Sequence, residues 1–285
     1  MRLTAKSASI NKIEFFLLGI GTSLIIINLF LIWKSGIIIN FYINSAFFIL
    51  ICLSLKEKRQ KLKFESGLPA TILGLLLLAC VFISSQNQIN FVVFSLFSPV
   101  MSGLGLAFLA SGFKGLRQYR IELIAMIFLS TRTLIYALSN YLDISPVTAK
   151  LSTAILWYTG FTVKLSGTII TFATSAVKVY GACSGMATML DMFSLGILFI
   201  FIFNLKWKQK ILVPVVAIIL GFIVNALRVA LMAILVNQGD SQAFNYWHDG
   251  DGSLIFSMIS ALLLCGFCWF LLSMNQQEDQ SILGS

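Results

Sequence analysis

The stretch "IEFFLLGIGTSLIIINLFLIW" (residues 13–33) decides the fold class of this 285-residue chain. It contains one charged side chain, Glu14, in an otherwise almost wholly apolar run. A helix of this length, rising about 1.5 Å per residue, crosses the ~30 Å hydrocarbon core of a bilayer. The run is too long for the apolar part of a signal peptide, and no clear small-residue cleavage site follows it. We therefore expect a retained first membrane helix.

Similar apolar runs recur along the chain. The composition is 58% hydrophobic and only 11% charged, whereas soluble domains carry about 25% charged residues. A membrane barrel would show short alternating segments instead. The sequence predicts an all-α polytopic membrane protein in one domain, 1–285, with a motif-bearing core at about 140–273. The eight expected spans are about 13–33, 37–55, 67–85, 91–112, 121–139, 183–203, 211–236 and 252–273.

The positive charges predict the orientation of these spans. Lysines and arginines concentrate in short loops, most clearly in "KEKRQKLK" (residues 56–63), and such loops stay cytoplasmic. With both termini cytoplasmic, fourteen of the 20 Lys and Arg lie in inside segments and four in outside segments. This distribution explains the net charge of +9 without a nucleic-acid partner. The lipid bilayer is the expected surroundings.

The same orientation leaves one longer extracytoplasmic segment, about 140–182, before the sixth span. Within it we expect an amphipathic helix at 146–165 lying on the bilayer. The following residues, 167–179, are rich in β-branched side chains and predict a hairpin. This hairpin leads directly into the stretch "VYGACSGMATML" (residues 179–190).

Cys183 is the only one of five cysteines that lies at a polar boundary; the other four lie inside apolar runs. Gly181 and Gly185 flank it and Ser184 follows it. A cysteine at the start of a helix faces the positive end of the helix dipole, which favours the thiolate. The backbone N–H groups there are also suited to bind an oxyanion. Cys183 is therefore either a small buried residue or a nucleophile.

Two further groups are expected on the same side of the membrane. His248, the single histidine, precedes the last span and is followed by Asp249; histidine exchanges protons near neutral pH. Arg228 lies inside the seventh span, where a charge costs at least ~2.5–3.5 kcal/mol and marks a functional candidate. Each also has a structural interpretation, for His248 an incidental position and for Arg228 a pairing with Asp191 or with helix carbonyls.

Together these residues suit covalent acyl transfer. Cys183 would attack, His248 would move protons, and Arg228 would stabilise negative charge. The main alternative is a transporter with Arg132, Asp191 and Arg228 along a solute path, although no internal repeat stands out. A membrane thiol oxidoreductase and a structural assembly factor are further alternatives. No metal cluster or phosphate-binding loop is visible, so we expect no cofactor.

Three segments in this order resemble the exosortase/archaeosortase family: "ACSGM" (182–186), "NALRVAL" (225–231) and "HDGDGSLIF" (248–256). The histidine in the third segment resembles the bacterial exosortase branch, with a cyanobacterial subgroup as one reading. The resemblance implies a membrane-embedded cysteine protease and transpeptidase, with Cys183 as nucleophile and His248 as general acid and base. It implies Arg228 as an oxyanion-stabilising or substrate-positioning cation. Ser184, Asn225 and Asp249 would support them.

The resemblance also implies the substrate class and the location. Substrates would be membrane-anchored proteins with a C-terminal sorting signal of the PEP-CTERM type: a short Pro-Glu-Pro-like motif, one transmembrane helix and a basic tail. Cleavage would occur through a thioester at the extracytoplasmic face of a bacterial inner membrane. An acceptor nucleophile or water would then resolve the thioester.

Overall fold

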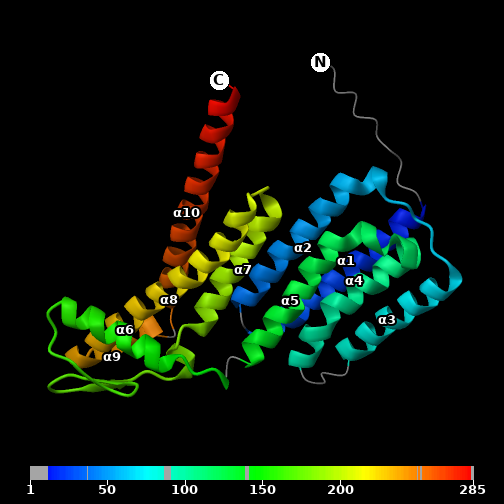
Figure 1. The fold of residues 1–285 in the computed structure, drawn as a ribbon. Coiled ribbons are helices and arrows are strands. Elements are labelled where there is room, and N and C mark those ends of the chain that lie inside the picture. Colours follow the sequence, from blue (N-terminus) through cyan, green and yellow to red (C-terminus); the bar gives the residue numbers. More distant parts are fainter. Residues whose placement is uncertain are drawn as a thin grey trace. The chain divides into compact units, whose positions relative to one another are not determined.

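The computed structural model describes residues 12–36, 38–86, 91–138, 141–248, 250 and 252–283. The chain divides into two compact units, Met1–Leu134 and Ile135–Ser285, and both consist mainly of helices (Figure 1). The expected single domain stays a prediction. The three proposed catalytic residues all belong to the second unit, whereas Arg132 belongs to the first.

The first unit is a bundle of long helices. They are α1 (Lys12–Lys34), α2 (Ile38–Lys58), α3 (Leu68–Gln86), α4 (Phe91–Gly115) and α5 (Arg120–Leu138), with 3₁₀ turns η1 (Arg59–Lys61) and η2 (Leu116–Tyr119). The last turn of α5, from Ile135, already belongs to the second unit. A tight turn follows Lys34, where the Gly36 N–H donates to the Trp33 carbonyl oxygen at 3.1 Å. Gly36 takes a φ of 78° there, a conformation that glycine adopts without steric cost.

Small residues bring α3 and α4 into close contact. A Cβ added to Gly74 would lie 2.8 Å from the carbonyl oxygen of Gly105. A Cβ on Gly105 would in turn lie 2.7 Å from the side chain of Leu78. Close approach at glycines is how helices associate in lipid, where apolar surface alone provides no driving force.

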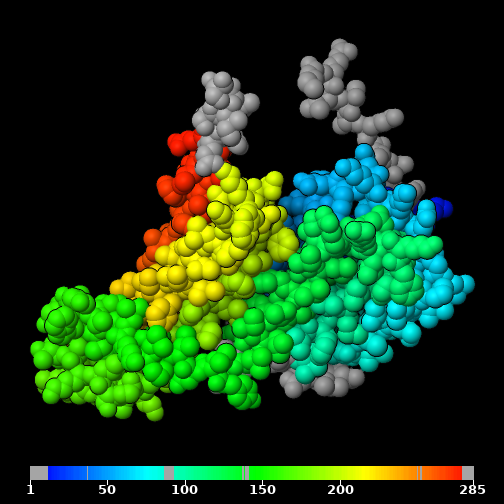
Figure 2. Space-filling model, viewed as in Figure 1, coloured from blue at the N-terminus to red at the C-terminus, as the bar shows by residue number. Residues whose placement is uncertain are grey.

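The second unit combines helices with a small sheet. Its elements are α6 (Ser145–Tyr158), β1 (Lys164–Ser166), β2 (Ile169–Thr171), β3 (Ala176–Lys178), the 3₁₀ turn η4 (Gly181–Cys183), α7 (Met186–Ile202), α8 (Trp207–Gln238), α9 (Ser241–His248) and α10 (Gly252–Leu283). In Figure 2 the residues of α6 and the sheet (green) gather at one end of this unit.

The sheet corrects the expectation of an all-α fold. Its strands are antiparallel in the order β1-β2-β3, and Ile170 pairs with Leu165 on one side and Val177 on the other. The hairpin expected at 167–179 is confirmed as β2 and β3, and a third strand extends it. Ile170 is fully buried, because the sheet lays one face on a core that includes Leu156 and Val229.

Helix α6 is shorter than the amphipathic helix expected at 146–165, since it ends at Tyr158. It packs against α8. Its buried residues are mostly small, among them Ser145, Thr148, Ala149 and Ser152. Small side chains allow the two helix backbones to approach closely, so α6 forms part of the protein core. Whether it also touches the bilayer stays a prediction.

By length and composition, seven helical segments in the described part of the chain are able to cross a membrane. The fourth, Val93–Tyr136, includes most of α4 and α5 and is 44 residues long, which is about twice what one crossing needs. Gly112 interrupts it with a non-helical φ of 61° and ψ of −167°. The polytopic helical class is supported. The count of eight spans and the cytoplasmic placing of both termini stay predictions.

Candidate active site

Cys183 lies at the end of η4, just before α7, and only 7% of it is exposed. The expectation that it stands in the first turn of a long helix is therefore wrong by a few residues. Its N–H donates to the Tyr180 carbonyl at 2.8 Å, and the Ser184 N–H donates to the Gly181 carbonyl at 3.1 Å. Both amides are thus used inside the turn and are not available to bind an anion at this sulfur.

Buried side chains hold this turn in place through its carbonyl groups. The amide of Asn225, on α8, donates to the Cys183 carbonyl oxygen at 3.0 Å. The Thr148 hydroxyl, on α6, donates to the Ser184 carbonyl oxygen at 2.6 Å. These bonds are buried, and each buried carbonyl left without a donor would cost about 1–3 kcal/mol. Asn225 and Thr148 therefore fix the backbone of the turn that carries Cys183. The expected supporting roles of Ser184 and Asn225 in catalysis stay predictions.

Gly185 is required between the turn and α7. Its φ is 88°, and an added Cβ would lie 2.6 Å from Nδ2 of Asn225. A side chain at this position would meet both backbone strain and the amide that holds Cys183. Glycine thus permits the sharp change from the 3₁₀ turn into the helix.

His248 is the last residue of α9, and its ring faces the cysteine. Nε2 lies 3.6 Å from Sγ of Cys183. The ring stacks on Phe244, one helical turn earlier, with centroids 5.1 Å apart and planes inclined by 14°. The structure therefore brings together the predicted nucleophile and the predicted base, which are 65 residues apart in the sequence.

Tyr180 is the site residue that the sequence analysis missed. Its hydroxyl lies 3.1 Å from the same Nε2 atom of His248. One imidazole nitrogen offers either one proton or one lone pair, so the thiol and the phenol share a single hydrogen-bonding position. The available signal was its place directly before "GACSG", where a tyrosine is large and polar enough to reach across the turn.

Arg228 contacts the backbone that carries His248. Its Nη2 donates to the His248 carbonyl oxygen at 2.5 Å, and its Nε lies 3.4 Å from the Trp247 carbonyl oxygen. Both carbonyls are at the C-terminal end of α9, where cations are favourable. This agrees with the alternative reading of Arg228 as a residue that caps carbonyls. Its expected action on an oxyanion or substrate stays a prediction.

The remaining residues singled out in the sequence have separate places. Asp249 lies outside the described residues. Asp191 lies in α7. Arg132 is buried in the first unit and donates to Oδ1 of Asn40 at 2.8 Å. The transporter alternative needs these two residues and Arg228 along one path. Arg132 lies in the first unit and the other two lie in the second, and the alternative stays untested.

The described residues contain no group of three or more His, Cys, Asp or Glu side chains able to hold a metal ion. All five cysteines are free thiols. The chemistry that the site itself offers is that of a thiol beside an imidazole and a phenol.

The family model described as transmembrane exosortase (Exosortase_EpsH) matches residues 36–265, most of the chain. The protein belongs to the transmembrane exosortase family. This family generally comprises membrane-embedded, cysteine-protease-like transpeptidases that sort proteins carrying sorting signals. No curated protein and no solved structure matches the chain. As an exosortase it is an integral membrane protein, and the matched region includes Cys183, Arg228 and His248.

Proposed function

We propose that this exosortase cleaves C-terminal sorting signals of the PEP-CTERM type through a thioester on Cys183. The observation that carries the proposal is the 3.6 Å approach of His248 Nε2 to Cys183 Sγ. This is a thiol and a base within reach of proton transfer, in a family of cysteine-protease-like transpeptidases. A nucleophile and a base so placed form the minimum set for covalent acyl transfer.

The reaction proceeds in two displacements. Nε2 of His248 takes the thiol proton while Sγ attacks the carbonyl carbon of the scissile peptide. The tetrahedral intermediate collapses, the C–N bond breaks, and the imidazolium returns its proton to the leaving amine. A thioester joins Cys183 to the exported protein. An amine acceptor or water then attacks the thioester carbonyl carbon while His248 takes the acceptor's proton. The C–S bond breaks, and the imidazolium gives that proton to the departing sulfur, which restores the Cys183 thiol.

Tyr180 is the proposed oxyanion donor. The amides of Cys183 and Ser184 are used within the turn, whereas the Tyr180 hydroxyl is part of the cluster around His248 Nε2. When Nε2 of His248 accepts the proton of the thiol, it no longer accepts a hydrogen bond from the Tyr180 hydroxyl. The hydroxyl can then donate to the negative charge that develops on the carbonyl oxygen of the substrate. A hydroxyl is a suitable donor for this purpose.

Arg228 is proposed as a positioning residue for His248. Its guanidinium joins α8 to the end of α9 through two successive carbonyls, which fixes the helix end that presents the imidazole. A guanidinium carries five N–H donors, so this role is compatible with the expected action of Arg228 on a substrate carboxylate or oxyanion.

The proposed substrate is a membrane-anchored protein, and the proposed location is the extracytoplasmic face of a bacterial inner membrane. Such a substrate presents its cleavage motif just outside its own transmembrane helix. In the expected topology Cys183 lies at that depth, after the longer outside segment. Lateral approach through the bilayer would then bring the scissile bond to the thiol.

Co-expression with a reporter bearing a Pro-Glu-Pro-type C-terminal signal tests the proposal. Immunoblotting should show a smaller reporter with the wild-type enzyme and full-length reporter with Cys183→Ala. Cys80→Ala is the matched control, because Cys80 is an exposed thiol on α3 of the first unit. An identical size shift in wild type and Cys183→Ala would exclude Cys183 as the nucleophile.

A further inference from the structure

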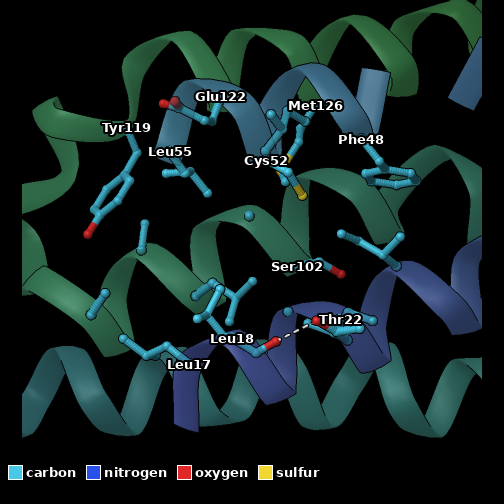
Figure 3. Close-up of a pocket in the computed structure, with 18 of the residues that line it drawn as sticks. Leu17, Leu18, Thr22, Phe48, Cys52, Leu55, Ser102, Tyr119, Glu122 and Met126 are labelled. Carbon is cyan, nitrogen blue, oxygen red and sulfur yellow. Dashed lines mark hydrogen bonds between the residues drawn. The ribbon is translucent and has the colours of Figure 1, made fainter. Parts of the chain in front are cut away.

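The first unit contains a cavity that the proposed chemistry does not use. It lies between α1, α2, α4 and α5 and has a volume of about 440 Å³. Its walls are mainly aliphatic and aromatic, and Figure 3 shows Leu18, Leu55, Phe48 and Met126 around it. We call this space the α1–α5 chamber.

The chamber exists because small residues line it where larger ones would fill it. Gly21 on α1 and Ser102, Ala107 and Ala110 on α4 are all part of its wall. A Cβ on Gly21 would lie 3.7 Å from its nearest neighbour, Leu106, so a methyl group there would make an ordinary van der Waals contact without a clash. Dense packing is the rule in protein interiors, and a space of this size therefore suits a ligand.

One end of the chamber is charged. Glu14, Lys56, Arg59 and Glu122 belong to its lining. Arg59 forms an ion pair with Glu14 at 2.7 Å, and Glu122 forms one with Lys58, also at 2.7 Å. Both carboxylates are thus neutralised.

Lys56 is exposed and takes part in neither of these ion pairs. It begins the basic segment "KEKRQKLK" (residues 56–63). With both carboxylates paired, Lys56 leaves a net positive charge at this end of the chamber. We call this charged end the mouth; it suits an anion, and the rest of the chamber is apolar.

The size and surroundings of the chamber select its occupant. An engineered apolar cavity of about 150 Å³ binds benzene, a molecule of six carbons. The chamber has about three times that volume, which corresponds to one long hydrocarbon chain. A substrate's transmembrane helix, about 10 Å wide and ~30 Å long, is several times too large for it.

We propose that the chamber binds one acyl chain of an anionic phospholipid, whose phosphate is held at the mouth by Lys56. The bilayer supplies acyl chains at high concentration around these helices. In the expected topology the mouth faces the cytoplasmic leaflet, where anionic lipids attract basic segments. The lipid joins the four helices from inside, so it is a structural ligand of the first unit and needs no role in the acyl transfer.

Native mass spectrometry of the full-length protein tests this inference. The protein is extracted from lipid nanodiscs that contain equal amounts of phosphatidylglycerol and phosphatidylcholine. Wild type should retain one phosphatidylglycerol molecule through detergent exchange. Ser102→Phe should lower that occupancy at least about tenfold, because each displaced methylene costs about fourfold in affinity. Ser23→Phe is the matched control, since Ser23 is exposed on α1 and is not part of the lining.

The head group is tested by a second pair of variants. Lys56→Gln should lower the preference for phosphatidylglycerol over phosphatidylcholine about fivefold, the contribution of one lysine near anionic lipid. Lys61→Gln, an equal charge change in the same exposed segment but outside the lining, should leave the preference unchanged. Both positions are on the surface, so folding is retained.

The inference would be overturned by a wild-type protein that retains no lipid, or by equal retention in Ser102→Phe and Ser23→Phe. Equal preferences in Lys56→Gln and Lys61→Gln would overturn the phosphate contact at Lys56. A retained peptide in place of a lipid would also contradict the proposal. None of these measurements depends on the cleavage reaction.

Discussion

The two units use buried polar side chains in different ways. Near the thiol and the imidazole of the second unit, several buried or half-buried side chains donate to backbone carbonyls of other elements. These bonds include Asn225 to Cys183, Thr148 to Ser184, Ser152 to Ala226 and Arg228 to His248. Each of these bonds fixes a piece of main chain near the thiol or the imidazole.

In the first unit, by contrast, the polar contacts that join its helices are mostly between two side chains. They include Asn28 with Ser98, Arg59 with Glu14, Lys58 with Glu122, and Arg132 with Asn40. Such contacts tie helices together without setting a backbone conformation. The difference indicates that polar side chains place the main chain near the thiol in the second unit, whereas in the first unit they hold helices together around the α1–α5 chamber.

The largest effect on activity beyond loss of the thiol is expected from His248→Gln. Removing the general base should lower the rate of reporter cleavage about 10³-fold, because proton transfer contributes that order of magnitude. Cleavage kinetics in membranes measure it. Gln242→Ala, an exposed change on the same helix, serves as control. Retained activity in His248→Gln would contradict the assignment of His248 as the base. It would also contradict the view that the geometry of the second unit serves to place that base.

Tyr180→Phe is expected to lower the cleavage rate about 10²-fold, the cost of one oxyanion donor. The rate at which a maleimide labels Cys183 in the intact protein should stay within about twofold, because the thiol and base remain in place. Tyr158→Phe, on the exposed face of α6, is the control. If labelling and cleavage fall together, Tyr180 acts on the base rather than on the intermediate.

Arg228→Lys separates positioning from charge and should lower the cleavage rate about tenfold. Lysine keeps the positive charge but cannot span two carbonyls with a planar fork. The expected signature is slower maleimide labelling of Cys183 together with slower cleavage, because His248 becomes less well placed. Full activity with lysine would instead support the simple cation that the family resemblance implies.

The smallest effect on activity is expected from Glu122→Gln in the first unit. It removes the ion pair with Lys58 and leaves a single oxygen to accept from Ser54, where the carboxylate had one oxygen for each partner. The free energy of unfolding should therefore fall by about 1–3 kcal/mol. Thermal unfolding in nanodiscs measures this, with Glu57→Gln as an exposed control. Cleavage by the folded enzyme should change less than about twofold. A large loss of activity would show that the two units are not functionally separate.

Several features of the second unit were predictable because they depend on local patterns. Apolar runs of about twenty residues predict the membrane helices, and the β-branched run at 167–179 predicts the hairpin. The sequence analysis expected Cys183 and His248 only on the same side of the membrane, and the structure places their side chains 3.6 Å apart. Asn225 and Ser184 were expected as supporting residues, but their bonding roles were not visible.

Other features depend on contacts between distant segments. The 3₁₀ turn at Cys183 forms where Asn225 and Thr148 donate to its carbonyl groups. The local sequence did not predict this turn. The direction of the Arg228 side chain depends on where α9 ends. Tyr180 reaches His248 because it follows β3, which ends at Lys178 and places the chain beside the end of α9.

The sequence by itself determined the membrane class and the reactive residue types, because hydrophobic length and the scarcity of charged and nucleophilic side chains are properties of composition and order. Only the tertiary structure decided which donors are already used, which nitrogen faces the sulfur, and where a chamber remains between helices. Those features depend on hydrogen-bond distances of about 3 Å and on the packing of side chains from four or more elements. Such geometry arises when the whole chain closes around them.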